Sequence, residues 1–243
     1  MKISDKCYVI YGLTTLPPWT VNSGFIVGDN KTLVIDCGSN YLSAQTIYGY
    51  AKSVKPQNEI IALNTEPHLD HLGGNCFFNE IGIDIYGHYK INRLENELKA
   101  VKSAYAECIV DTIRQQNNEE EFVFSKTKIV NPNKKINSDC FIDLGGLFVK
   151  IILTPGHTQM NISVYVEEEK ILFCGDVVVN EYIPNIEDGN KDDWQAWKQS
   201  LDKIKKLSPE IIVSGHGEIL KGEKIKTEIQ RIEDYLTAAI NNT

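Results

Sequence analysis

The sequence predicts an α/β fold of four layers, in which two β-sheets stack face to face and helices cover the outer side of each sheet. Two observations support this expectation. Apolar strands are followed by amphipathic helices, and this order occurs twice along the chain. The 243 residues can bury a substantial core, and no stretch rich in proline, glycine and serine marks a boundary. We therefore expect one domain, residues 1–243.

Three strands precede the first expected helix. The first two are joined by TTLPPWT, whose prolines force an extended connection. The third ends at Cys37-Gly38, after which Ser39 or Asn40 can cap a helix. A fully apolar strand follows that helix, and the polar stretch NTEPHLDHLGGN begins directly at its end. The strands of this part are expected at 6–13, 21–27, 31–36 and 59–63.

A short strand at 83–86 precedes a long helical segment from about 89 to 116. Apolar residues in this segment recur at alternating steps of three and four, which gives a heptad-like seam. These residues are Ile91, Leu94, Leu98, Val101, Tyr105 and Cys108. The seam could pack on its own domain, cover a site as a lid or form a homodimer contact. The polar run QQNNEEE at 115–121 predicts an exposed loop, so we expect a helical insertion over about 89–121.

The second half repeats the order of strands and helices. A helix at 193–206 carries four apolar residues on one face, which predicts packing on a core. These are Trp194, Trp197, Leu201 and Ile204. A final helix is expected at 222–240. The strands of this half are expected at 127–130, 140–143, 147–153, 162–166, 170–174 and 210–213.

Charge and composition exclude some classes of function. The net charge is -8 and the sequence pI is near 5.2, which disfavours nucleic acid as a partner. No apolar run reaches the roughly 18 residues that a membrane span requires, and we recognise no export signal. The cysteines form no C-x-x-C pair, so we expect reduced thiols and a cytoplasmic location. They are Cys7, Cys37, Cys76, Cys108, Cys140 and Cys174.

Titratable residues follow several apolar strands. Leaving such a side chain buried is costly unless something binds it. One structural zinc needs four ligands and has no room for water, whereas seven ligands suit two metals about 3.5–4 Å apart with a hydroxide between them. The lack of cysteine among them favours a catalytic site. The seven candidates are Glu66, His68, Asp70, His71, His157, Asp176 and His216.

Four motifs carry a resemblance to a known family. NTEPHLDHLGG, LTPGHT, FCGD and VSGHG resemble, in order and spacing, the metal-binding motifs of the metallo-β-lactamase superfamily. The segment VNSGFIVGDNKTLVIDCG resembles its opening hairpin, with Cys37 where threonine is commoner. The resemblance implies an αββα sandwich and assigns the ligands. Site one takes Glu66, His68 and His157, site two takes Asp70, His71 and His216, and Asp176 bridges the two.

Glu66 departs from the family pattern. The family reads H-x-H-x-D-H, and this chain reads E-x-H-x-D-H. We expect Glu66 to be a direct ligand. The alternative is that its carboxylate lies behind the ligands or faces solvent, which would leave site one with weak affinity for metal. As a ligand it lowers the net charge of the dimetal cluster, which predicts a rate optimum at higher pH than for an all-histidine site. Its oxygen also shifts the preference of the site modestly from zinc toward manganese or iron. Zinc is still the first choice.

The expected activity is metal-dependent hydrolysis of a small-molecule ester, lactone, thioester or amide. The metals polarise the scissile group, the bridging hydroxide attacks, and Asp70 orients the hydroxide or moves its proton. The missing export signal disfavours an exported β-lactamase, and the acidic charge disfavours a ribonuclease. Two alternatives remain: an iron-dependent oxidoreductase on the same fold, and a non-catalytic binding module with a weakened site one.

Two further residues are candidate substrate contacts. Trp19 lies in the TTLPPWT connection, which could form an apolar flap over the cleft or pack as an ordinary hairpin. His88 follows the strand IDIYG and is either a hydrogen-bonded structural histidine or a contact with substrate.

Overall fold

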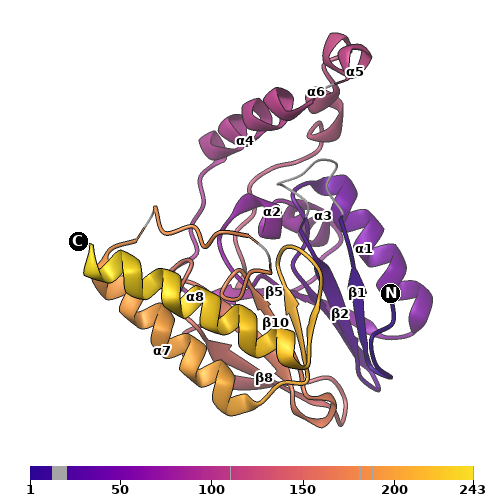
Figure 1. The fold of residues 1–243 in the computed structure, drawn as a ribbon. Helices are drawn as coiled ribbons and strands as arrows, with labels where there is room; N and C mark the ends of the chain where they lie inside the picture. The colour runs from indigo at the N-terminus through magenta and orange to yellow at the C-terminus, as the bar shows by residue number, and fades with distance from the viewer. Residues whose placement is uncertain (13–20, 110, 181, 188, 243) are drawn as a thin grey trace.

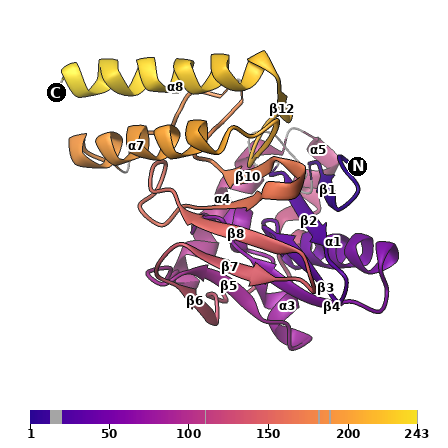
Figure 2. The ribbon, with the colours of Figure 1, turned by 90° about the horizontal axis from the view of Figure 1, so that it is seen from below.

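Two six-stranded sheets stack face to face in the computed structural model, which describes residues 1–12, 21–109, 111–180, 182–187 and 189–242 (Figure 1, Figure 2). Helices cover the outer side of each sheet, as the sequence predicts. The strand orders are β1-β2-β3-β4-β5-β6 in one sheet and β12-β11-β10-β9-β8-β7 in the other. The two sheets therefore come from the two halves of the chain.

The first sheet begins with three antiparallel strands and continues with parallel ones. Its outer face packs on α1 (Tyr41–Val54) and α3 (Asn75–Glu80). Asn40 caps α1, since its side chain accepts a hydrogen bond from the backbone N–H of Ser43. The strands are β1 (Cys7–Ile10), β2 (Ser23–Val27), β3 (Lys31–Ile35), β4 (Glu59–Leu63), β5 (Ile85–His88) and β6 (Lys134–Ile136).

The second sheet packs on α7 (Lys191–Leu207) and α8 (Glu223–Asn241), which confirms the two helices expected at 193–206 and 222–240. The four apolar residues of α7 are buried against this sheet, as expected. The strands are β7 (Cys140–Asp143), β8 (Phe148–Leu153), β9 (Ile162–Val166), β10 (Ile171–Gly175), β11 (Ile211–Ser214) and β12 (Leu220–Lys221), with a 3-10 turn, η1 (Glu167–Glu169), after β9.

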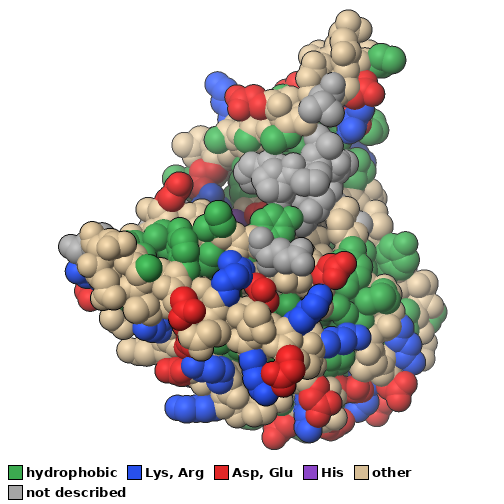
Figure 3. Space-filling model, viewed as in Figure 1, with side chains coloured by type: hydrophobic (Ala, Val, Ile, Leu, Met, Phe, Trp, Pro, Cys, Tyr) green, Lys and Arg blue, Asp and Glu red, His purple; other side chains and the backbone are tan. Residues whose placement is uncertain are grey.

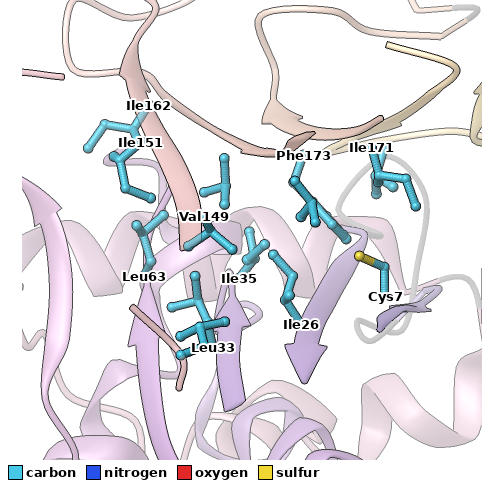
Figure 4. Packing of buried hydrophobic residues seen from close by; sticks show 14 of the residues in the cluster. Cys7, Ile26, Leu33, Ile35, Leu63, Val149, Ile151, Ile162, Ile171 and Phe173 are labelled. Atoms are coloured by element: carbon cyan, nitrogen blue, oxygen red, sulfur yellow. The ribbon is translucent and has the colours of Figure 1, made fainter. Parts of the chain in front are cut away.

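The main core lies between the two sheets. Figure 4 shows Leu33 and Leu63 of the first sheet pointing toward Val149 and Ile151 of the second, with Phe173 beside them. All five side chains are buried. Complete burial of an aliphatic or aromatic side chain stabilises a fold by roughly 1.5–3 kcal/mol. This core fixes the strand ends from which the loops of the candidate site extend.

The insertion between β5 and β6 projects from the body of the molecule (Figure 1). It contains α4 (Glu95–Cys108), α5 (Thr112–Gln116) and α6 (Glu119–Val123). The expectation of one helix over 89–116 is wrong, because Ile109 is extended and the Asp111 side chain caps a new helix. The loop expected at 115–121 is also wrong, since three acidic residues favour the N-terminus of α6. The dimer contact stays a prediction.

Other differences concern short elements. The strand expected at 127–130 is absent from the described residues, and β6 pairs in parallel with β5 in its place. The one-turn helix α2 (Leu69–Leu72) and the helix α3 were not predicted. Within the described ranges, no helix has the length and apolar composition needed to cross a bilayer. The cytoplasmic location and the single domain stay predictions.

Candidate metal centre

The seven predicted ligands lie at one edge of the sandwich. In the first sheet β3 and β4 are parallel, and Glu66 and His68 follow the carboxyl end of β4. In the second sheet β8, β10 and β11 run in the same direction, so the loops after them reach the same edge. Those loops carry His157, Asp176 and His216. Gly215 permits this approach, because a Cβ there would lie 2.1 Å from Asp176 Oδ1.

The helix α2 places the remaining two ligands. His68 caps α2 in an extended conformation, and Asp70 and His71 follow within its single turn. His71 is fully buried, whereas Asp70 keeps a small exposed fraction. Asp70 Oδ2 lies 3.2 Å from His216 Nε2 and 3.7 Å from His71 Nε2. Asp70, His71 and His216 therefore form one group whose ligand atoms could hold an ion.

A second group consists of Glu66, His68 and His157. Glu66 is fully buried, with Oε1 2.9 Å from His68 Nδ1 and Oε2 3.7 Å from His157 Nε2. His68 Nδ1 and His157 Nε2 lie 3.1 Å apart. Two basic nitrogens and a carboxylate thus face one point, and the solvent-facing alternative for Glu66 is wrong. Its role as a direct ligand stays a prediction.

Asp176 lies between the two groups. Its Oδ2 is 3.2 Å from His216 Nε2 and 3.8 Å from His157 Nε2. Its Oδ1 is 3.6 Å from His71 Nε2, and the ligand atoms of Glu66, His71 and Asp176 also lie close enough to hold an ion. A carboxylate that reaches histidines of both groups fits the predicted bridging position.

The charges of the seven side chains are strongly coupled. Burial opposes protonation of His68, but the Glu66 carboxylate outweighs burial and raises the pKa of His68 to about 9. Burial likewise opposes protonation of His216, and Asp176 and Asp70 raise its pKa to about 11. Burial opposes ionisation of Asp70, yet His71 and His216 lower its pKa to about 2. His216 and His71 likewise hold the pKa of Asp176 well below its usual range although burial opposes its ionisation, so Asp70 and Asp176 carry negative charge at neutral pH and favour bound cations.

Two buried atoms of the cluster lack a hydrogen-bond partner among the described residues: His71 Nε2 and Asp176 Oδ1. Buried polar atoms without a partner are costly, and a metal ion bound between them would satisfy both. The donors are imidazole nitrogens and carboxylate oxygens, which suit zinc and also manganese or iron. Burial raises the pKa of the nearby Cys174 thiol to about 12, so this cysteine stays protonated. The residues present therefore fit divalent ions.

Asp36 is a functional residue that the sequence reasoning missed. It follows β3 in a left-handed conformation, with φ of 58°, and is buried. Its Oδ2 lies 2.9 Å from His71 Nδ1, and Thr65 donates to the same carboxylate through its backbone N–H and its hydroxyl. Its position directly after an apolar strand, shared with the predicted ligands, is a signal that could have identified it.

A cleft of about 420 Å³ opens at the cluster. Five predicted ligands line it, together with apolar residues of α2, α4 and the loop between β10 and α7. Arg231 fixes that loop by donating hydrogen bonds to the backbone oxygens of Val179 and Tyr182. Figure 3 shows hydrophobic side chains gathered over the same loop. The lining residues besides the ligands are Leu69, Arg93, Val101, Val179, Tyr182, Ile183 and Asn185.

The two candidate substrate contacts remain predictions. Trp19 lies in 13–20, outside the described residues. His88 is buried, and its Nδ1 accepts a hydrogen bond from the backbone N–H of Lys90. Burial lowers the pKa of His88, so a neutral ring is favoured there. These observations support the interpretation of His88 as a structural histidine, and a contact with substrate stays a prediction.

Comparison with known proteins identifies the family and several relatives. The family described as the metallo-beta-lactamase superfamily matches residues 16–216. An acyl-coenzyme A thioesterase of Gallus gallus is 26% identical over 75% of this chain and 64% of its own length. A hydroxyacylglutathione hydrolase of Francisella tularensis subsp. novicida is 29% identical over 39% of this chain and 37% of its own length. The chain spans 29% to 64% of the first curated relatives it matches.

A solved structure supports the fold. A metallo-beta-lactamase family protein from Thermus thermophilus superposes with a TM-score of 0.71 at 17% identity. The superposition covers 98% of this chain and 81% of that protein. At this identity the likeness concerns the fold, and it confirms the four-layer αββα sandwich predicted from the sequence.

Proposed function

The chain belongs to the metallo-beta-lactamase superfamily, and we propose that it hydrolyses a small acyl substrate at a dinuclear metal centre. Among the possible acyl substrates, a thioester is favoured over an ester, a lactone or an amide. The observation that carries the proposal is the position of Asp176 between two groups of three ligands. The similarity to an acyl-coenzyme A thioesterase of Gallus gallus and to a hydroxyacylglutathione hydrolase of Francisella favours the thioester among the acyl substrates.

Two divalent ions, zinc first, fit the donors of the cluster. Glu66, His68 and His157 would hold one ion, and Asp70, His71 and His216 the other, with Asp176 shared. Ions bound there supply Lewis acidity, which activates water and polarises the scissile carbonyl. Glu66 adds an oxygen donor to site one, so manganese and iron are the next candidates.

Asp70 would both hold an ion and act on the nucleophile. The pKa of its carboxyl is about 2, so it is a carboxylate at neutral pH and can accept a hydrogen bond from water in the cleft. Its place within the lining of the cleft leaves it accessible to such a water. A carboxylate there can orient the attacking water and receive its proton. Apolar side chains around the cleft, such as Val101, Val179 and Ile183, would contact the acyl part of the substrate.

A second candidate is an iron-dependent oxidoreductase on the same fold. The buried carboxylate of Glu66 is the observation that favours it, because an added oxygen ligand increases the relative affinity for iron. A non-catalytic binding module with a weakened site one is less favoured, because the three residues of site one face one another at short distances.

Metal analysis combined with a hydrolysis panel tests the proposal. The content of zinc, iron and manganese is measured in protein purified without added metal. Hydrolysis is then measured with four substrates: acetyl-N-acetylcysteamine, a matched oxygen ester, a lactone and an amide. We expect two zinc ions per chain and thioester turnover that chelation abolishes and zinc restores. Stoichiometric iron with no hydrolysis of any substrate would support the oxidoreductase instead.

A further inference from the structure

Two cavities adjoin at site one. One is the cleft of about 420 Å³ described above, and the other is a smaller pocket of about 230 Å³. Their linings share three residues, His68, His157 and Arg93. Two of the three are predicted ligands. The third, Arg93, stands where a substrate bound across site one would extend from one cavity into the other.

The permanent positive charge of Arg93 distinguishes it from the other described residues that line the two cavities. Among the described residues that line the two cavities, it is the only lysine or arginine. The other ionisable residues of these linings are the predicted ligands and Asp193, together with the Tyr182 phenol. A guanidinium presents a planar set of N–H donors that matches the oxygens of a carboxylate or phosphate. Arg93 is therefore suited to receive an anionic group beside site one.

The guanidinium keeps donors for a ligand. Its Nη2 pairs with Glu97 of α4. Its Nε is buried and has no hydrogen-bond partner in the part of the chain that the structure describes. The Arg93 side chain as a whole is 29% exposed, so the rest of the guanidinium stays accessible. An unpaired buried N–H is unfavourable, and a small shift of the side chain toward an incoming anion would relieve this cost.

The backbone of Arg93 is also fixed. Asn131 accepts a hydrogen bond from the Arg93 N–H at 2.7 Å and donates one to the Arg93 carbonyl at 3.0 Å. Lys135 donates to the carbonyl of Ile91 just before it. These contacts hold the segment in place without a ligand, which reduces the entropy lost on binding.

We propose that Arg93 is a specificity-determining residue that binds a carboxylate or phosphate on the substrate. The anionic group would lie at Arg93, and the acyl group would lie toward Val101 and Ile183 in the cleft. The substrate class is then an acyl compound with an anionic group near the scissile bond. This inference rests on the proposed hydrolase function for its biological meaning, but its binding step can be measured separately.

Three thioethers that lack a thioester bond test the binding step: butylthiopropanoate, butylthioethyl phosphonate as a stable mimic of a phosphate, and the neutral butylthiopropanamide, each checked to be intact after the titration. Calorimetry measures their Kd for zinc-loaded wild type and for Arg93→Gln. We expect wild type to bind at least one anion about 10- to 100-fold more tightly than the amide, as for a charge-assisted hydrogen bond. Arg93→Gln should remove that preference and leave the affinity for the amide unchanged. The preferred anion identifies carboxylate or phosphate as the natural group.

A second variant, which is expected to increase the affinity for the anion, strengthens the test. Glu97→Gln removes the carboxylate that competes for the guanidinium, while its amide oxygen can still accept the hydrogen bond from the Leu94 N–H. This variant should bind the anionic thioether more tightly than wild type. Lys102→Gln is the matched control, because Lys102 is a cation of α4 outside both linings that pairs with Glu121. It should behave as wild type.

Other outcomes separate the two proposals. If Arg93→Gln keeps the preference for anions, the metal ions recognise them and the role of Arg93 is wrong. Equal binding of all three thioethers by wild type would also overturn it. If the preference depends on Arg93 but no acyl substrate turns over, the binding role stands and the hydrolase proposal fails.

Discussion

Asp36 Oδ2 lies 2.9 Å from His71 Nδ1, while Nε2 of the same ring faces Glu66 Oε1 at 3.1 Å and Asp176 Oδ1 at 3.6 Å. The Asp36 carboxylate can accept a hydrogen bond from the Nδ1–H of His71, which holds the ring with Nε2 toward the cluster. When the ring binds a metal it loses the Nε2 proton, and this contact then leaves the Nε2 lone pair directed at the ion. Thr65 donates twice to Asp36 and fixes the carboxylate in turn.

Replacing Asp36 by asparagine should weaken metal binding. The amide can no longer enforce the tautomer of His71, and the loss of such a partner typically costs about 10- to 100-fold in metal affinity. Competition with a chromophoric zinc chelator measures the Kd. Asp29→Asn, at an exposed aspartate of the same hairpin, is the control and should keep the wild-type Kd. An unchanged Kd in Asp36→Asn would show that His71 does not depend on Asp36.

Replacing Glu66 by histidine should move the rate optimum to lower pH. The substitution removes one negative charge from site one, so the ions act more strongly on the pKa of the water nucleophile. The measurement is kcat/KM against pH for a thioester, with metal content determined for both proteins. An acidic limb, where the rate rises as the water nucleophile is deprotonated, that does not move at equal metal content contradicts the direct role of Glu66.

Metal binding should release protons at neutral pH. In the metal-free protein the pKa of His68 is about 9 and that of His216 is about 11, so both rings are protonated at pH 7. A ligand must lose its proton to bind a metal, and zinc affinity should therefore rise as pH increases from 7 toward 9. Calorimetry in buffers of different ionisation heats counts the protons. Release of no protons at pH 7 would contradict the assignment of these two histidines.

The sequence predicted the gathering of the seven candidate side chains better than it predicted their surroundings, for a physical reason. His157 and His216 follow apolar strands, and the burial of those strands brings their ends to one edge. The single turn of α2 has four residues, too few for a periodic pattern. Asp36 lies far from the ligand motifs in sequence and meets His71 only through the pairing of β3 with β4.

The insertion shows how a periodic pattern can mislead. Leu94 continues the heptad seam in sequence, yet it is 56% exposed and stands before α4 as its cap. Leu98 and Tyr105 pack with Phe124, which lies just after the run 115–121 that the sequence predicts to be an exposed loop. The pattern identified the buried face correctly over 98–105, but tertiary contacts set where the helix begins and ends.

Two tryptophans of α7 allow a matched test of how the helix supports the site. Trp197 Nε1 donates to the carbonyl of Val177, next to Asp176, and its ring contacts His157 at 6.0 Å between centroids. Trp194 Nε1 has no hydrogen-bond partner among the described residues. Both rings are buried, so replacement by phenylalanine removes a similar volume in each case.

Trp197→Phe should therefore lower the free energy of unfolding more than Trp194→Phe does. Only the first variant leaves a buried carbonyl unpaired, which adds about 1–3 kcal/mol to the loss of unfolding free energy. Urea unfolding of the metal-free proteins measures the difference. Trp197→Phe should also weaken zinc binding, because the residues beside Asp176 and His157 lose a support, whereas Trp194→Phe should not. Equal losses of stability and of zinc affinity in the two variants would mean that α7 acts only through apolar packing.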